Sequence, residues 1–284
     1  MKAVVILGDG MADYPVPALR GQTPLMVARI PAMDTIAKNG RTGLFRTIGP
    51  GLSTGSAVAN LTDLGYDPRT DYKGRGVLEA ASLGIAVSED DLVFRVNLIH
   101  IADGRIASHS AGHISNEDAG ILIKDLTDPA AKLGIRLHQG LSYRHIGILR
   151  GGDERLLFTE PHDYIGDRVS DRMVQYLDPG AMDTADRLNR MVTESQSLLS
   201  DHPVNRRRRS EGKLTADSLW PWSPGKKPHM ATFASLTNAR AAVISAVDLI
   251  KGIAVYACMD VVSVKGATGF HNTNYEGKAH ALPS

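Results

Sequence analysis

The order of strand and helix patterns along the chain constrains its fold more than any other feature. Residues 3–7 form a short apolar run that a Gly-Asp-Gly turn ends, which is typical of a buried central strand. A helix pattern over residues 32–40 and a strand pattern over 41–48 follow, and residues 241–269 again indicate strand, helix and strand. This alternation predicts an α/β core. Asp9 then stands at the edge where open α/β sheets bind ligands, unless it only shapes the turn.

The pattern changes from about residue 70. Residues 91–112 predict two strands joined by an Asp-Gly turn, and Ser115 with Asp118 has the spacing of a helix cap, so that a helix should begin near Asn116. Two further strands are expected over 141–152 and 155–163, and a long helix within 171–203. After a Pro/Gly-rich break at 223–230 the α/β pattern returns. We infer a core, residues 1–68 and 215–284, interrupted by an inserted α+β domain over residues 69–214.

Composition narrows the class of protein. With 284 residues, 43% hydrophobic residues and a net charge of +1, the chain has the composition of a globular protein with no general attraction for polyanions. Its single cysteine, Cys258, excludes a disulfide within the chain and fits a reducing compartment, so we expect a cytoplasmic protein. The sequence has no signal-peptide pattern and no run of about 18 apolar residues, so no membrane association is expected.

Residues 50–68 place three hydroxyl side chains between glycines, directly before an amphipathic run. One interpretation takes Ser53 in a Gly-x-Ser-x-Gly motif as the nucleophile of a serine hydrolase, although Pro50 breaks the required passage from strand to turn. A second puts Ser56, or else Thr54, at the N-terminus of a helix, where backbone N–H groups stabilise a phosphate or an oxyanion. A third makes Ser56 only the cap of that helix.

Histidines and arginines gather in the middle of the chain. His109 and His113 have the spacing of a zinc site on a helix, but Gly112 between them favours a loop that contacts a phosphate or carboxylate. Arginine forks bind the same groups. The run Arg206–Arg209 is also compatible with a solvated face or a nucleic-acid patch, yet the lack of a basic surplus and the 5% aromatic content argue against nucleic acid.

Several long motifs occur in a fixed order: LGDGMAD, GSAVANLTDLGYDP, GRGVLEAASLGI, SAGHIS, LSYRH, HPVN and GATGFHNTNYEGKA. With them the chain resembles, over nearly its whole length, the archaeal-type cofactor-independent phosphoglycerate mutases of the alkaline phosphatase superfamily. The resemblance implies an alkaline-phosphatase-like core with a mainly parallel sheet and an inserted substrate domain. It also implies that 3-phosphoglycerate and 2-phosphoglycerate are interconverted through a phosphoserine, with two divalent cations (Mn, Mg or Zn).

The motif matches suggest roles for individual residues. Asp9 is similar to a metal ligand of the family, and Ser56 is similar to its nucleophile, which also contacts metal. The substrate contacts implied by the resemblance are Arg144, His162, Asp163, Asn205 and Arg208, together with His109 and His113.

The chain also departs from the family pattern. Ala57 stands where relatives commonly carry an acidic residue, and the family continues by roughly a hundred residues beyond the last motif, with further metal ligands. We therefore expect the two cations to be incompletely liganded and this chain alone to show little mutase activity. A related phosphotransferase, such as a homoserine-kinase-like enzyme, and a non-catalytic protein that binds phosphorylated acids stay open. The expected partner is a small molecule, and the oligomeric state is open.

Overall fold

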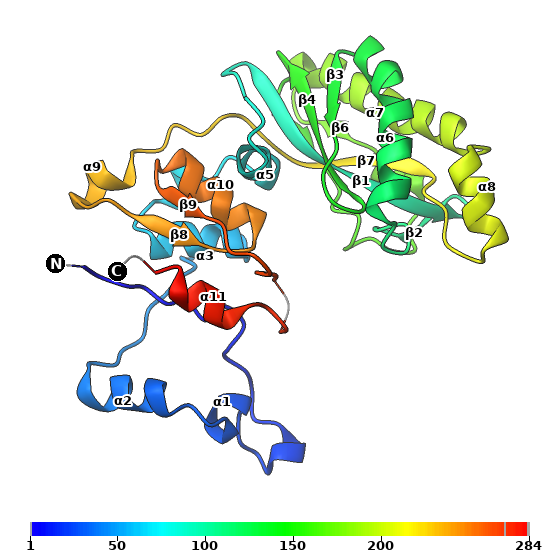
Figure 1. The fold of residues 1–284 in the computed structure, drawn as a ribbon. Helices are drawn as coiled ribbons and strands as arrows, with labels where there is room; N and C mark the ends of the chain where they lie inside the picture. The colour runs from blue at the N-terminus through cyan, green and yellow to red at the C-terminus, as the bar shows by residue number, and fades with distance from the viewer. Residues whose placement is uncertain (1, 270, 283–284) are drawn as a thin grey trace. The chain divides into compact units, whose positions relative to one another are not determined.

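The computed structural model describes residues 2–269 and 271–282, and the chain divides into two compact units, residues 1–46 and 47–284 (Figure 1). The first unit holds a 3-10 turn, Pro17–Leu19, and two helices, α1 (Pro24–Val27) and α2 (Pro31–Asn39). None of its described residues is buried. The helix expected over residues 32–40 is therefore confirmed as α2, which ends at Asn39 before Gly40.

The two strands expected near the N-terminus are wrong. Residues 3–7 and 41–48 form no strand, and Val5 and Leu44 are exposed. An apolar, β-branched run indicates that a segment suits a buried sheet, but a strand forms only where a neighbour supplies hydrogen bonds. Within the described residues no strand pairs with either segment.

The second unit is built around an antiparallel sheet. Its strands are β1 (Asp91–Ala102), β2 (Arg105–Ser108), β3 (Ile135–His138), β4 (Arg144–Arg150) and β7 (Ser218–Gly225). The order is β2-β1-β4-β3, and β7 also pairs with β1. The hairpin expected from the Asp-Gly turn is confirmed as β1–β2. The chain is a mixed α/β protein, but the expected mainly parallel sheet is not confirmed, because β8–β9 is the one parallel pair among the described residues.

Alternation along β1 decides which face of the sheet is covered. Leu92, Phe94, Val96 and Leu98 belong to the core cluster that α6 (Asn116–Lys132) and α7 (Met182–Leu199) complete (Figure 1). Arg95 and the other odd-numbered residues point to the opposite face. Helix α6 begins as expected, since the hydroxyl of Ser115 accepts a hydrogen bond from the backbone N–H of Asp118. The long helix expected within 171–203 is α7.

The rest of the second unit is built from helices and short strands that precede and follow the antiparallel sheet in the sequence. These elements are α3 (Ser56–Asp63), α4 (Pro68–Asp71), α5 (Arg75–Ser82), α9 (Phe233–Thr237), β8 (Ala242–Ile244), α10 (Asp248–Tyr256), β9 (Asp260–Val262) and α11 (Tyr275–His280). The expected strand, helix, strand near the end is β8–α10–β9. Helices α5 and α10 share one core and pack closely at Gly252, where a Cβ would lie 1.9 Å from the carbonyl oxygen of Leu78. Segments far apart in sequence therefore share one core.

Smaller elements complete the unit. They are α8 (Pro203–Ser210), the paired strands β5 (Leu156–Leu157) and β6 (Gln175–Tyr176), and 3-10 turns at Val169–Arg172 and Pro179–Ala181. The strand expected over residues 155–163 is thus only the short β5. Among the described residues, no helix is both long enough and apolar enough to cross a membrane.

The segment that carries the antiparallel sheet begins and ends at one place. A Cβ on Gly74 would lie 2.0 Å from the carbonyl oxygen of Pro224, and a Cβ on Gly225 would lie 1.5 Å from that of Lys73. Only glycine permits this approach of two backbones. Strand β7 lies wholly after residue 214, and the domain boundaries at 68 and 214 stay predictions.

Burial of His145 makes stability depend on pH. His145 is 1% exposed on β4, and desolvation lowers its pKa from 6.5 to about 3. As the pH falls below about 6.5, the unfolded chain takes up a proton that the folded chain refuses, so stability is full above that pH and falls below it. We expect the free energy of unfolding to drop by about 1.4 kcal/mol from this group between about pH 7.5 and about pH 5.5.

Urea unfolding at both pH values checks this expectation. The variant His145→Asn should lose that part of the pH dependence, because an amide does not titrate and can still accept from the backbone N–H of Gly140. His229→Asn, at a side chain that is 79% exposed, is the control and should retain it. An unchanged pH dependence in His145→Asn would contradict the assignment.

Candidate functional site

Four polar or aromatic side chains project from the sheet face opposite α6 and α7. Arg95 pairs with Trp222 across β1 and β7, and Asn97 pairs with Arg144 across β1 and β4. Directly paired residues in antiparallel strands project to the same side. The strand register therefore brings together residues from three distant parts of the sequence.

Arg95 forms the floor of this face. It is 3% exposed, its guanidinium carbon lies 4.2 Å from the ring centre of Trp222, and its Nε lies 3.0 Å from a carboxylate oxygen of Glu79 on α5. Desolvation lowers the pKa of Arg95 to about 10, partly offset by the charge of Glu79. Arg95 stays charged near neutral pH, and its guanidinium stacks on the ring of Trp222.

Loops bring three imidazoles and a tyrosine over the same face. The ring centres of His109 and His162 are 6.1 Å apart, those of His162 and Trp222 5.3 Å, and those of His109 and Tyr143 5.6 Å. His113 lies 5.8 Å from Tyr143. We call these five residues, with Arg144, the histidine cluster. Partial burial, followed by the charges of His162 and His113, lowers the pKa of His109, so its neutral imidazole is favoured.

His109 and His113 lie in a loop, as Gly112 suggested, and not on a helix. Ala111, Gly112 and His113 have φ values of 46°, 65° and 53°, in the left-handed region that costs energy for residues other than glycine. The hydroxyls of Ser108 and Ser110 accept hydrogen bonds from the backbone N–H groups of Gly112 and His113, both at 3.3 Å. These bonds hold the strained loop in place.

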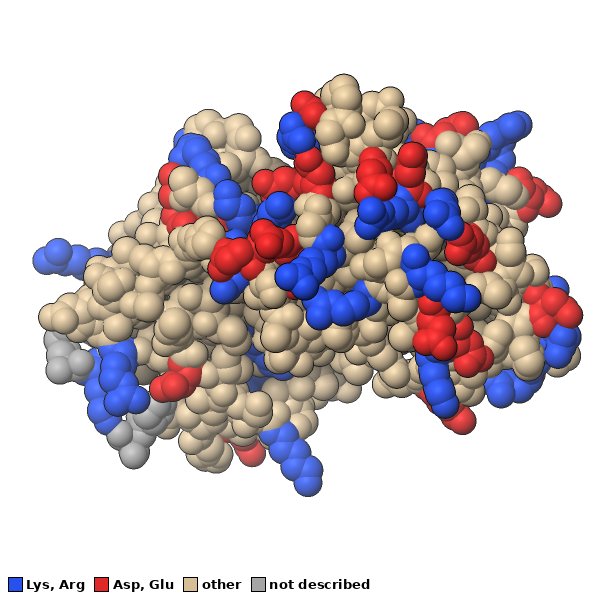
Figure 2. All heavy atoms as spheres, turned by 90° about the horizontal axis from the view of Figure 1, so that it is seen from above, with Lys and Arg blue, Asp and Glu red and all other residues tan. Residues whose placement is uncertain are grey.

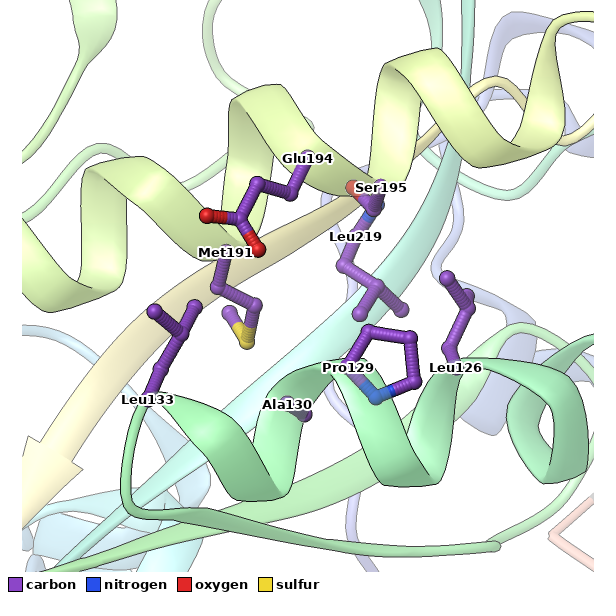
Figure 3. A pocket seen from close by; sticks show the side chains of 8 residues that line it. All are labelled: Leu126, Pro129, Ala130, Leu133, Met191, Glu194, Ser195 and Leu219. Carbon is purple, nitrogen blue, oxygen red and sulfur yellow. The ribbon is translucent and has the colours of Figure 1, made fainter.

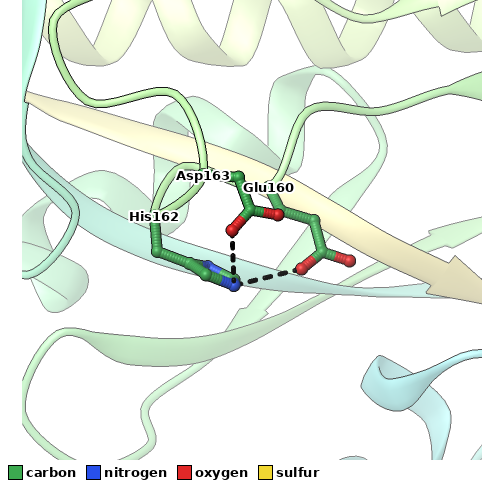
Figure 4. Close-up of side chains that lie close together, drawn as sticks. All are labelled: Glu160, His162 and Asp163. Carbon is green, nitrogen blue, oxygen red and sulfur yellow. Dashed lines mark ion pairs between the residues drawn. The ribbon is translucent and has the colours of Figure 1, made fainter. Parts of the chain in front are cut away.

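Three exposed side chains at one end of the cluster could hold a metal ion. His162 Nε2 lies 3.2 Å from a carboxylate oxygen of Glu160 and 3.7 Å from one of Asp163 (Figure 4). One imidazole and two carboxylates are donors that Mn²⁺ and Zn²⁺ accept. Without a cation, the same contacts are ion pairs of His162. Sequence reasoning missed Glu160, whose only signal was a carboxylate two residues before His162.

Arg144 offers the cluster a positive charge. It is exposed, and its guanidinium carbon lies 5.5 Å from the ring centre of Tyr143. In the described part of the chain no carboxylate forms an ion pair with it. A guanidinium in this position can form two parallel hydrogen bonds to a carboxylate or phosphate. The cluster therefore suits a small anion.

Comparisons with known proteins agree on one family. The family model described as 2,3-bisphosphoglycerate-independent phosphoglycerate mutase matches residues 37–205. The protein of that name from Methanosarcina barkeri is 48% identical over 99% of this chain and 69% of its own length, and a probable one from Geobacter sulfurreducens is 44% identical over 99% and 70%. The chain belongs to the family of 2,3-bisphosphoglycerate-independent phosphoglycerate mutases.

Solved structures agree with this family. A protein structure from Pyrococcus horikoshii, 32% identical, superposes with a TM-score of 0.74 over 96% of this chain and 64% of its own length. The cofactor-independent phosphoglycerate mutase of Thermoplasma acidophilum, 28% identical, superposes with a TM-score of 0.56 over 90% and 68%. The chain thus spans about two thirds of the length of the relatives that it matches.

Two residues that the resemblance suggested as substrate contacts of the mutase family have structural roles here. Asn205 is fully buried, and its amide joins the backbone of Leu199 and Ala216. Arg208, also buried, donates to Asp118 and to the carbonyl oxygens of Leu214 and Ala111. None of the hydrogen bonds described for these two side chains is to a residue of the histidine cluster. Arg208 instead supports the loop that carries His109 and His113.

The arginine run is occupied by partners within the chain. Arg206 pairs with Asp201, Arg207 with Asp118, and Arg209 donates to the carbonyl oxygen of Ser200. Acidic and basic side chains are interspersed on the face that Figure 2 shows. The run therefore stabilises α8 and its neighbours and leaves no free row of charges for a polyanion.

Ser56 keeps its hydroxyl free. It is the first residue of α3, the cap is Gly55, and no described backbone group bonds to the Ser56 hydroxyl, so a capping role for Ser56 is wrong. Ser53 lies in a loop without a preceding strand, so it lacks the setting of a hydrolase elbow. Asp9 belongs to the first unit and Ser56 to the second, so their pairing as metal ligands stays a prediction.

Tyr72 follows α4, and burial raises its pKa, opposed by the charge of Arg75 and a hydrogen bond to Ser223. No described contact joins Ser56 itself to the cluster.

The cavity between α6 and α7, lined by Leu126, Pro129 and Met191, has a volume of about 10 Å³ and room for about one water, which excludes phosphoglycerate (Figure 3).

Proposed function

We propose that the protein interconverts 3-phosphoglycerate and 2-phosphoglycerate through a phosphoserine at Ser56. The observation that carries the proposal is the exposed Ser56 hydroxyl at the first position of α3, which the helix does not use as a cap. Backbone N–H groups at a helix N-terminus stabilise phosphoryl oxygens, and family membership supplies the substrate. The proposed compartment is the cytoplasm, where the exposed thiol of Cys258 stays reduced.

The reaction consists of two phosphoryl transfers. Ser56 Oγ gives up its proton and attacks the phosphorus of 3-phosphoglycerate, the bond from phosphorus to the C3 oxygen breaks, and that oxygen takes up a proton to give glycerate. The C2 hydroxyl of glycerate then gives up its proton and attacks the phosphoserine, the bond from phosphorus to Ser56 Oγ breaks, and Ser56 Oγ takes up a proton. His109, whose lowered pKa favours the neutral form, is suited to accept the proton of the attacking hydroxyl in each step and to return it to the departing oxygen.

Divalent cations fit the residues proposed for them. Asp9 and Ser56 provide hard oxygen donors, as Mg²⁺ and Mn²⁺ require, and Glu160, His162 and Asp163 form a second group of donors. Bound cations would neutralise charge on the phosphoryl oxygens and favour the alkoxide of the attacking hydroxyl. In this proposal Arg144 binds the substrate carboxylate, together with the imidazoles around it.

Phosphorus NMR tests the function directly. The protein is incubated with 3-phosphoglycerate and Mn²⁺ for long enough to detect the low activity expected when the cations are incompletely liganded. We expect the signal of 2-phosphoglycerate to rise slowly toward the ratio that is also approached from 2-phosphoglycerate. Mass spectrometry should find the phosphate on Ser56. Release of inorganic phosphate alone would contradict a mutase, and transfer of the phosphate to added homoserine would favour the related phosphotransferase.

Arg144→Leu should weaken the binding of 3-phosphoglycerate by about 10- to 100-fold, because hydrogen bonds to a charged group contribute about 1.5–3 kcal/mol. Calorimetry measures the change in Kd. Arg150→Leu, at the exposed far end of the same strand, is the matched control and should bind as the wild type does. Equal affinities of both variants would remove Arg144 from the site.

A further inference from the structure

Asn97 is a buried side chain that the proposed chemistry does not use. It is 1% exposed on β1, beneath the histidine cluster. Its amide nitrogen donates to the backbone carbonyl oxygen of His109 at 2.9 Å, and its amide oxygen accepts from the indole N–H of Trp222, also at 2.9 Å. One amide thus joins the loop that carries His109 to strand β7.

The two partners of Asn97 both lie next to His162. The ring of His162 lies 6.1 Å from that of His109 and 5.3 Å from that of Trp222, with interplanar angles of 68° and 67°. Among the described residues, the ion pairs of His162 are with two exposed carboxylates, those of Glu160 and Asp163. Its orientation therefore depends on the two rings, and their separation depends on Asn97.

Burial makes this arrangement specific. A buried amide with both ends bonded is stable in one orientation only, since a flipped amide would set donor against donor at Trp222 and acceptor against acceptor at His109. The guanidinium of Arg95 stacks on the ring of Trp222 and limits how far the ring can move. Arg95 forms no hydrogen bond to the indole nitrogen. Asn97 supplies the bond that fixes the rotation of the ring.

We propose that Asn97 is a positioning residue of the phosphoglycerate site, which sets the His109 loop and the Trp222 indole at the separation that orients His162 toward the substrate. The identity of the substrate in this proposal rests on the proposed function, whereas the geometry around Asn97 does not. The two parts can therefore be tested separately.

The chain has two tryptophans, which provide an internal control. In protein labelled with nitrogen-15 at the indoles, Asn97→Leu should accelerate hydrogen exchange of the Trp222 N–H by about tenfold or more, because a lost hydrogen bond of this kind corresponds to about 1.4 kcal/mol. The indole N–H of Trp220 donates to the carbonyl oxygen of Thr159 at 2.9 Å and should keep its rate. Equal acceleration at both indoles would show general loosening and overturn the proposal.

The second measurement is the affinity for 3-phosphoglycerate, by calorimetry. Asn97→Leu should weaken it by about tenfold, while Asn189→Leu should not change it. Asn189 is the matched control, because its amide also joins two groups, the backbone N–H and carbonyl of Val174, away from the cluster. Equal losses in the two variants would overturn a positioning role.

A milder variant keeps the proposal testable if Asn97→Leu does not fold. Trp222→Phe retains an aromatic ring next to His162 and loses the indole donor to Asn97. It should weaken binding by less than Asn97→Leu, and full affinity would overturn the proposal. If the wild-type protein fails to bind 3-phosphoglycerate, the proposed function fails, and indole exchange alone decides whether Asn97 fixes Trp222.

Discussion

Replacing Ser56 by alanine is expected to lower the rate of interconversion by about 1,000-fold or more. Loss of a catalytic nucleophile leaves only the contribution of binding and electrostatics. Because Arg144 and the imidazoles bind the substrate in our proposal, the Kd for 3-phosphoglycerate should change little. Phosphorus NMR gives the rate and calorimetry gives the affinity, so the two effects can be separated in one set of samples.

Ser53→Ala is the matched control for this experiment. It removes a hydroxyl from the same exposed segment, three residues away, and should leave the rate unchanged. If Ser53→Ala lost activity and Ser56→Ala did not, the nucleophile would be Ser53. A phosphorylated peptide that lacks Ser56 would contradict the proposal in the same way.

Arg208→Leu is expected to lower the free energy of unfolding by about 3–5 kcal/mol. Arg208 is 4% exposed at its side chain, lies 3.0 Å from a carboxylate oxygen of Asp118, and also bonds two backbone carbonyls. Removal of Arg208 leaves two carbonyl groups without a donor and leaves Asp118 with only the half-exposed Arg207 as a cationic partner among the described residues. Urea unfolding measures the loss.

Arg206→Leu separates this effect from the general loss of a charge. Arg206 is in the same helix and pairs with Asp201, but both side chains are largely exposed. Such pairs contribute about 0–1 kcal/mol. Similar losses in the two variants would mean that Arg208 does not support the fold in the way described. A substrate-binding role of Arg208 would instead show as lost affinity at unchanged stability.

Local signals predicted the fold well where neighbours in sequence decide the structure. The cap at Ser115, the Asp-Gly turn of the hairpin and the apolar spacing of α7 all depend on residues within a few positions of one another. Residues 3–7 failed because a central strand depends on partners elsewhere in the chain. The sequence pattern indicated that this segment tends to form a strand, but it did not indicate which strand would pair with it.

The candidate site shows the same division. His109, Arg144 and His162 were selected by residue type and by resemblance, but only the register of β1 with β4 and β7 brings their segments over one face. The role predicted for Arg208 stays a prediction, and its guanidinium fork pairs with the carboxylate of Asp118, because such a fork binds a buried carboxylate as well as a substrate. Asn97 had no signal in the sequence, since one buried asparagine in a strand resembles any other.

The close approach of Gly74 and Gly225 has a consequence for how such a protein is assembled. The stretch of about 150 residues between them begins with α5 and ends with β7, and its two ends are already neighbours. A recombination event that added, removed or exchanged this stretch would leave the rest of the chain with only a small gap to close. The geometry allows new recognition surfaces to be tried over an unchanged set of helices.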